Sequence, residues 1–193
     1  MPPKAKFTRD EIIEAAFNIV KTDGIEALTS RALGTQLGSS ARPIFTVFNN
    51  MDEVQQAVIN SAKTMYKEEY VKKGLMEEHP FKGVGMQYIF FSVNEPKLFQ
   101  LLFMTEQPQL PDLTGVFPLV EESYDEILLS IQADYGINKF SAEKLYHHLW
   151  IYTHGIATLC ATKMCRFTGT EVSSMITEIC TSILKNIKGV KKP

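Results

Sequence analysis

The segment from Thr29 to Phe48 constrains the fold most, because its sequence, TSRALGTQLGSSARPIFTVF, predicts two short amphipathic helices joined by a tight turn. Leu33 and Leu37 lie four residues apart and form the apolar face of the first helix. Gly38 can adopt the left-handed backbone conformation that often ends a helix. Two helices at this spacing form a helix-turn-helix, whose second helix enters the major groove of DNA.

The second helix of this motif is predicted to run from about Ala41 to Phe48, with Ser39 or Ser40 as its cap. Pro43 would fall in the first turn, where a missing backbone N–H costs little. The polar and small side chains of this helix would then face outward.

Arg31 and Arg42 are the only charged residues between Ala27 and Asn50, so the segment presents no carboxylate to DNA phosphates. We expect Arg42 to read guanine, because a guanidinium can bond O6 and N7 together. Arg31 and Thr29 are expected to contact phosphate. The simpler alternative is an ordinary capped surface helix. The predicted DNA contacts, including lysines before the first helix, are Lys4, Lys6, Thr29, Arg31, Ser39, Ser40, Ala41, Arg42, Pro43, Thr46 and Asn50.

Helical patterns continue on both sides of the motif, and they predict an all-α protein. Thr8 and Glu11 have the spacing of a capping box, at the start of a helix that ends at Asp23-Gly24. Later helices are predicted over 52 to about 78, 117–135, 141 to about 166 and 170–187, with short proline-broken helices between them. We expect a helix-turn-helix DNA-binding domain in residues 1–50 and a helical regulatory and dimerisation domain in residues 51–193.

The last two predicted helices each carry an apolar stripe with helical periodicity. Pairs of such helices from two subunits could form a four-helix interface, so we expect a homodimer. The residues predicted for that interface are Leu149, Tyr152, Ile156, Val172, Met175, Ile176, Ile179 and Ile183.

Aromatic and methionine residues are frequent between Met86 and Met104, where prolines interrupt the helices. Such residues are often plain core, but irregular helices also enclose ligand cavities. A cavity of this kind would take a small apolar or aromatic effector. The predicted ligand contacts are Phe91, Phe103, Tyr124, Trp150 and His154, although for His154 a hydrogen-bonded structural role is favoured over a ligand contact.

Composition excludes several classes of protein. Hydrophobic residues make up 45% of the 193 and charged residues 22%, which is typical of an ordered chain rather than a disordered one. A formal net charge of −2 argues against nonspecific coating of nucleic acid, so positive charge has to be concentrated locally. No signal peptide or membrane-spanning run is evident, and we expect a cytoplasmic protein with no membrane partner.

Catalysis is not predicted. His147 and His154 share a helical face seven residues apart, but they do not form a complete metal-ligand or catalytic set. Three cysteines without a CxxC pair indicate neither a disulfide framework nor a zinc ribbon. No phosphate-binding loop or nucleophile elbow occurs. We therefore expect no enzyme activity, no cofactor and no metal.

At the helix-turn-helix the chain resembles the TetR family of bacterial transcriptional regulators. Nine ordered positions fall where that family usually has Thr, Arg, Ile, an aliphatic residue, Gly, Ser, Leu, Tyr and Phe; here they are Thr29, Arg31, Leu33, Leu37, Gly38, Ser40, Ile44, Phe45 and Phe48. The later segments LWIYTHGIATL, with Trp150, His154 and Gly155, and NEPKLFQLLF resemble a WHG-type regulatory domain.

The resemblance implies an all-helical homodimer that binds a palindromic operator and is released from DNA by a small molecule. Two positions depart from the family pattern, since Phe45 replaces a frequent tyrosine and Met51 a frequent lysine. Both changes remove polar reach toward phosphate. The alternative is therefore a helical ligand-binding module that has lost specific DNA binding.

Overall fold

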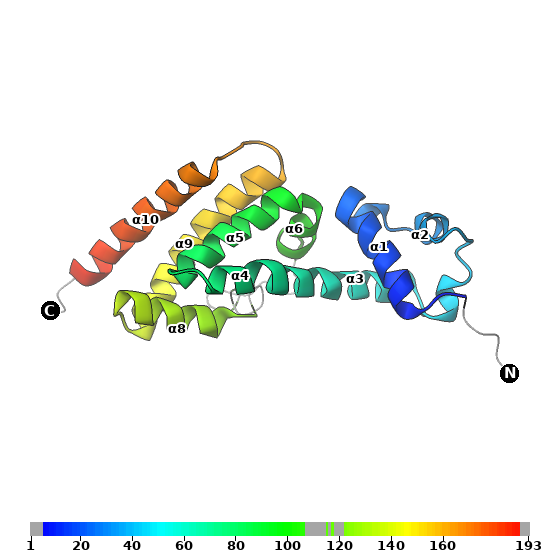
Figure 1. Cartoon of the computed structure of the whole chain (residues 1–193), viewed down its shortest axis with the longest axis horizontal. Coiled ribbons are helices and arrows are strands. Elements are labelled where there is room, and N and C mark those ends of the chain that lie inside the picture. The colour runs from blue at the N-terminus through cyan, green and yellow to red at the C-terminus, as the bar shows by residue number, and fades with distance from the viewer. Residues whose placement is uncertain (1–5, 107–114, 116, 118–121, 190–193) are drawn as a thin grey trace. The chain divides into compact units, whose positions relative to one another are not determined.

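The computed structural model describes residues 6–106, 115, 117 and 122–189. Every regular element in this part of the chain is helical, which confirms the predicted all-α class (Figure 1). None of these described helices combines the length and apolar character needed to cross a membrane.

The chain forms two compact units. The first contains residues 1–65 and 97–105, and the second contains residues 66–96 and 106–193. This division differs from the expected boundary after residue 50, because helix α3 (Met51–Tyr66) is bonded to helix α1 (Arg9–Asp23) through an ion pair between Glu53 and Arg9.

The first unit begins with the predicted capping box. The Thr8 hydroxyl accepts a hydrogen bond from the Glu11 backbone N–H at 3.2 Å, and the Glu11 carboxylate accepts one from the Thr8 N–H at 2.7 Å. Helix α1 ends at Gly24, as expected, and Gly24 has a φ of 92°. The unit continues with η1 (Ile25–Ala27), α2 (Ser30–Gln36), η2 (Ile44–Thr46), α3 and most of α6 (Pro96–Phe103). Its buried core includes Ile12, Ala16, Val20, Leu33, Ile44, Phe48, Val54 and Val58.

The helix predicted from residue 52 to about 78 runs without a break from Met51 to Leu75. It consists of α3, the π-helical turn η3 (Lys67–Val71) and α4 (Lys72–Leu75). In the second unit, two glycines allow α4 and the helix that follows it to approach closely. A Cβ added at Gly83 would lie 2.3 Å from the Gly74 carbonyl oxygen. A larger residue at either glycine would separate α4 from α5 (Pro80–Asn94).

The rest of the second unit consists of α8 (Tyr124–Tyr135), α9 (Lys139–Ala161) and α10 (Gly169–Gly189). Helix α9 packs along α5 and also contacts α8 and α10. Its start differs from the expected Ser141, because Asn138 caps the helix by accepting a hydrogen bond from the Ser141 N–H at 2.9 Å. It also ends before Arg166. Asn138 is a strong N-cap residue, so the cap lies three residues earlier than predicted.

Candidate functional site

The first of the two helices predicted within residues 29–48 is present as α2 in the first unit. Thr29 caps α2 by accepting a hydrogen bond from the Ala32 N–H at 3.1 Å. After α2, Gly38 has a φ of 62°, and the Ser39 N–H donates to the Gly34 carbonyl oxygen at 2.8 Å. The backbone therefore turns sharply after α2, as the sequence predicts.

The second helix of the motif is shorter than predicted. In place of an α-helix from Ala41 to Phe48, the structure has the three-residue 3₁₀ turn η2. Pro43 stands at its N-cap without a side-chain hydrogen bond, so neither Ser39 nor Ser40 caps it. Pro43 also removes one backbone donor, and the following bonds have the tighter i to i+3 spacing, including Val47 N–H to the Ile44 carbonyl at 3.0 Å.

The turn is packed tightly against α2 at a residue that the sequence analysis did not select. A Cβ added at Gly34 would lie 2.9 Å from the Ala41 nitrogen and 2.9 Å from the Ser40 carbonyl carbon. Since these are backbone atoms, a side chain at Gly34 would displace the turn. The available signal was a glycine inside an amphipathic helix, which costs about 1 kcal/mol relative to alanine and usually has a packing reason.

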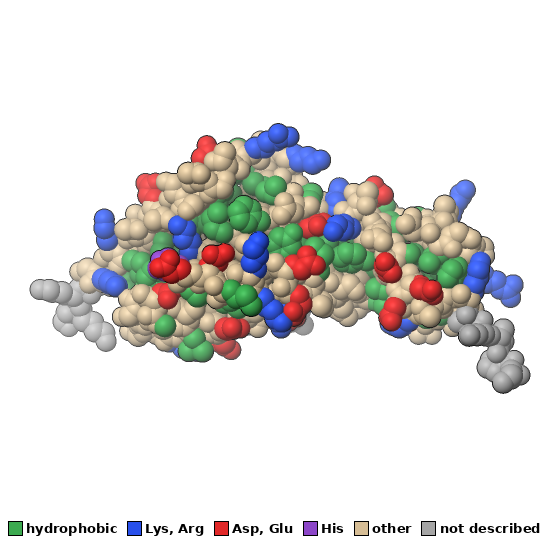
Figure 2. Space-filling model, viewed as in Figure 1, with side chains coloured by type: hydrophobic (Ala, Val, Ile, Leu, Met, Phe, Trp, Pro, Cys, Tyr) green, Lys and Arg blue, Asp and Glu red, His purple; other side chains and the backbone are tan. Residues whose placement is uncertain are grey.

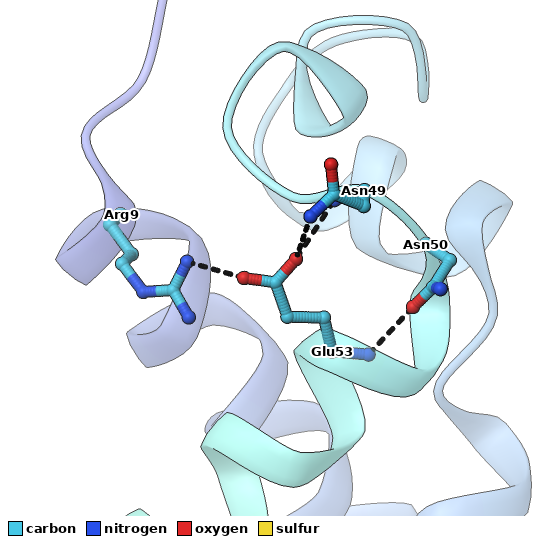
Figure 3. Close-up of polar contacts among 4 residues, drawn as sticks. All are labelled: Arg9, Asn49, Asn50 and Glu53. Atoms are coloured by element: carbon cyan, nitrogen blue, oxygen red, sulfur yellow. Dashed lines mark hydrogen bonds and ion pairs between the residues drawn. The ribbon is translucent and has the colours of Figure 1, made fainter.

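A polar cluster of α1, α3 and the loop between η2 and α3 fixes the end of the motif (Figure 3). One oxygen of the Glu53 carboxylate accepts a hydrogen bond from Arg9 Nη1 at 2.9 Å. The other accepts from the Asn49 backbone N–H at 2.9 Å and from its side-chain amide at 3.0 Å. The Asn49 N–H and then the Arg9 guanidinium hold the pKa of Glu53 below its ordinary value. The cluster therefore fixes where the loop enters α3.

Asn50 belongs to the same cluster. Its side-chain oxygen accepts a hydrogen bond from the Glu53 N–H at 2.9 Å, so it caps the start of α3. Arg9 also covers Phe48, with its guanidinium carbon 4.2 Å from the ring centroid. Asn50 followed three residues later by Glu53 is the capping pattern that could have identified this cluster from the sequence.

The predicted DNA contacts fall into two groups in the structure. Several are already bonded locally: Thr29 caps α2, Asn50 caps α3, and the Thr46 hydroxyl donates to the Pro43 carbonyl at 2.6 Å. Arg31, Ser40 and Arg42 are exposed, whereas Ser39, Ala41 and Pro43 are partly buried in the turn. Lys4 lies outside the described residues.

Lys6 lies beside the motif. Its Nζ donates a hydrogen bond to the Ser39 hydroxyl at 2.9 Å, so a cation from the start of the chain stands at the turn between α2 and η2. The Phe45 ring, in η2, is 45% exposed. Lys6, Arg31 and Arg42 are therefore three cations that lie on the segment from α2 to η2 or are bonded to it.

The second unit contains a cavity of about 320 Å³, which lies at the small end of the range for small-molecule sites. The side chains of α5 and α9 supply aromatic walls, among them Phe81, Tyr88, Tyr146 and Trp150. Helix α10 contributes Thr177, Cys180 and Thr181 from one of its faces. Tyr135, the last residue of α8, also lines the cavity. The cavity therefore combines a largely aromatic wall with a few polar groups.

Trp150 is the one predicted ligand contact that lines this cavity. His154 stands behind the wall, where its ring stacks on Trp150 with centroids 4.8 Å apart and its Nδ1 lies 2.8 Å from the Tyr88 hydroxyl. Burial lowers the pKa of His154. These contacts are those of a structural histidine that orients Tyr88 and Trp150.

The other three predicted ligand contacts lie elsewhere. Phe91 is fully buried, with its ring centroid 5.0 Å from those of Tyr66 and Tyr70. Phe103 belongs to the first unit and packs on Phe99 at 5.3 Å. Tyr124 does not line the cavity but belongs to an aromatic cluster that packs behind the wall residue Tyr146.

In that cluster, Tyr124 packs edge-on to Tyr146 at 5.0 Å, and its hydroxyl lies 3.4 Å from His147 Nε2. Phe117 stacks on His147 at 4.4 Å. Burial lowers the pKa of His147, although nearby Glu143 opposes this shift. The cluster fills the space between α8 and α9 with aromatic rings.

The residues predicted for the dimer interface fall into a buried group and a partly accessible group. Leu149, Ile156, Val172 and Ile176 are buried inside a single subunit, because α9 and α10 pack on each other and on α5. Tyr152, Met175, Ile179 and Ile183 keep part of their surface accessible.

Large apolar side chains also remain on the surface of the second unit. Ile151 is exposed beside this set on α9, and Phe90 and Val93 are exposed on α5. Hydrophobic side chains are visible among charged ones in the space-filling view (Figure 2). The accessible members of the predicted set, rather than all eight, are the ones available to a second subunit.

Among the described residues of the cavity wall, Cys180 does not have the lowered pKa of an activated thiol. Cys180 donates weakly to the Tyr135 hydroxyl at 3.7 Å, and burial raises the pKa of its thiol. The pKa of Tyr135 is likewise raised, chiefly by burial. Across the described ranges, no three His, Cys, Asp or Glu side chains gather as a metal site would require.

No protein-family model and no curated protein matches this sequence.

Proposed function

We propose that the chain is a ligand-responsive DNA-binding transcriptional regulator, a repressor that binds a palindromic operator as a homodimer in the cytoplasm. The DNA-binding segment is the turn from α2 to η2, and the effector is a small apolar or aromatic molecule held in the cavity of the second unit. The resemblance to TetR regulators supports this proposal, and it assigns no enzyme activity.

Three cations that lie on the segment from α2 to η2, or are bonded to it, carry the proposal. Arg31 and Arg42 extend from a segment without a carboxylate, and Lys6 is bonded to the same turn through Ser39. Phosphate contacts of this kind supply affinity and register, while an arginine in the groove supplies sequence discrimination.

Regulation follows from dimer geometry. Two half-sites on successive turns of DNA require recognition elements roughly 34–36 Å apart. An effector would favour a subunit arrangement in which this spacing is lost, and its leverage is limited to its difference in affinity between the two arrangements. The unbroken helical run from Met51 to Leu75 passes from one unit into the next along the chain, so we assign it the coupling role.

One observation favours the second candidate, a ligand-binding module that has lost specific DNA binding. The element that would enter the groove is a single 3₁₀ turn, and Phe45 and Met51 have no polar group to offer a phosphate. This candidate keeps the cavity and the dimer but has no operator.

Selection from genomic DNA separates the two candidates. The full chain is incubated with sheared genomic DNA from its source, and bound fragments are recovered and sequenced at two salt concentrations. A specific regulator enriches a palindrome that survives the higher salt. Uniform recovery that vanishes with salt is the result expected of nonspecific phosphate contact and supports the second candidate.

A further inference from the structure

The cavity of the second unit has a positive charge in its wall. Lys82, in the first turn of α5, lines the cavity, and its Nζ donates a hydrogen bond to the Thr177 hydroxyl on α10 at 3.0 Å. Its charge is close enough to the cavity interior to lower the pKa of the Cys180 thiol in opposition to burial. The ammonium therefore acts on the cavity interior.

No carboxylate faces Lys82 from inside the cavity, since the described lining residues include neither Asp nor Glu. Glu77 and Glu78 border Lys82 in a separate, shallower depression. Neither forms an ion pair with it within 4.0 Å among the described residues. The charge has a neutral hydroxyl as its partner in a solvent-exposed hydrogen bond, and an anion forms a stronger, charge-assisted hydrogen bond with an ammonium.

Other features of the wall also suit an anion with an apolar body. The Tyr135 hydroxyl accepts from Cys180, which leaves its own proton to donate to another group. The start of α5, where Lys82 lies, has no side-chain cap, and the positive end of a helix dipole favours negative charge. The rings of Tyr88, Tyr146 and Trp150 line the same cavity.

We propose that the cavity binds a small organic monocarboxylate, with the carboxylate on Lys82 Nζ and an aromatic or short aliphatic body against Trp150 and Tyr88. A single ammonium matches a single negative charge, and about 320 Å³ suits one ring or a short chain rather than a polycyclic drug. The inference rests on the proposed ligand-responsive function and narrows its effector to an acid.

Trp150 is the only tryptophan of the chain, so its fluorescence reports this cavity directly. The full chain is titrated, without DNA, with benzoate, 3-phenylpropionate and octanoate, each paired with its uncharged primary amide. We expect at least one acid to bind about tenfold more tightly than its amide, because a charge-assisted hydrogen bond is lost in the amide. The preference should weaken as salt is added.

Substitutions test whether Lys82 supplies the positive charge that binds the carboxylate. Lys82→Met should bring the acid and its amide to equal affinity, and Lys82→Arg should retain the preference. Lys144→Met, which removes an exposed lysine of α9 outside the cavity wall, should leave the preference unchanged.

Equal affinity of acid and amide in the unmodified chain overturns the proposal, as does an acid preference that survives Lys82→Met. Failure of all three pairs to change Trp150 fluorescence or release heat in calorimetry also overturns it. These outcomes are independent of operator selection: an operator without acid binding rejects only this inference, and acid binding without an operator rejects only the regulator.

Discussion

The turn in the first unit and the cavity in the second unit are formed by different kinds of interaction. Those of the turn join residues close in sequence, and those of the cavity join residues far apart. On either side of the turn, Thr29 caps α2 by accepting a hydrogen bond from the Ala32 N–H, and Asn50 caps α3 by accepting one from the Glu53 N–H. Each bond spans three residues of sequence. In the cavity, the lining side chains come mostly from α5, α8, α9 and α10, with Tyr66 from the end of α3. A polar surface can therefore be set by local bonds, whereas an apolar cavity depends on packing between helices far apart in the chain.

Replacing a buried aromatic ring should give the largest change in stability. It tests whether Phe91 belongs to the hydrophobic core. Phe91→Ala is expected to lower the free energy of unfolding of the second unit by about 3–5 kcal/mol, because a fully buried aromatic side chain is lost. Urea unfolding followed by Trp150 fluorescence measures this unit. Phe45→Ala, the same change at an exposed ring, should cost under about 0.5 kcal/mol by circular dichroism. Similar losses for the two variants would contradict the distinction.

A side chain at Gly34 should break the local order of the first unit. Gly34→Val is expected to cost about 1–3 kcal/mol, because its Cβ meets the backbone of Ser40 and Ala41. Hydrogen exchange of residues 29–48 should rise in this variant, and retention of DNA should fall with it. Thr35→Val, an exposed neighbour with the same β-branched product, serves as the control. Unchanged protection in Gly34→Val would mean that the turn does not need this close approach.

The range of the interactions also explains what the sequence could predict. The capping box at Thr8, the cap at Thr29 and the turn at Gly38 depend on a few adjacent residues, and all three are present. Most helices of the second unit were located because their apolar periodicity is itself local. Pro43 is the exception in the first unit, since a proline in a first turn is compatible with an α-helix but does not require one.

The cavity wall could not be predicted in this way. Periodicity shows that Phe91 and Trp150 each face other helices, but it does not show which of them borders empty space. Phe103 was predicted to line the cavity because it belongs to the aromatic-rich stretch between Met86 and Met104, yet α6 belongs mostly to the other unit. Lys82 carried no apolar signal at all, and its place in the wall follows from the contact with Thr177 on α10.

Two cations of the first unit should affect DNA binding differently. Arg42→Ala is expected to reduce discrimination between the selected operator and random duplex by about 1–3 kcal/mol, because an arginine in the groove reads base edges. Lys6→Ala should weaken both complexes alike and reduce the slope of log affinity against log salt by about 1. Fluorescence anisotropy over a salt series measures both effects. Equal losses on operator and random duplex for Arg42→Ala would remove its assigned reading role.

The smallest expected effect tests whether the polar cluster at Glu53 stabilises the first unit. Because hydrogen bonds from Asn49 and Arg9 depress the pKa of Glu53, its contribution is complete above the ordinary value of 4.5 and is lost as pH falls through the lower, folded-state value. Glu53→Gln should therefore lower Tm at pH 7, and the difference from the unmodified chain should shrink as pH falls below 4.5. Glu14→Gln, at an exposed glutamate of α1, provides the charge-matched control and should show no such convergence. A Tm difference for Glu53→Gln that stays constant across this range would mean that shape, rather than the carboxylate charge, holds Asn49 in place.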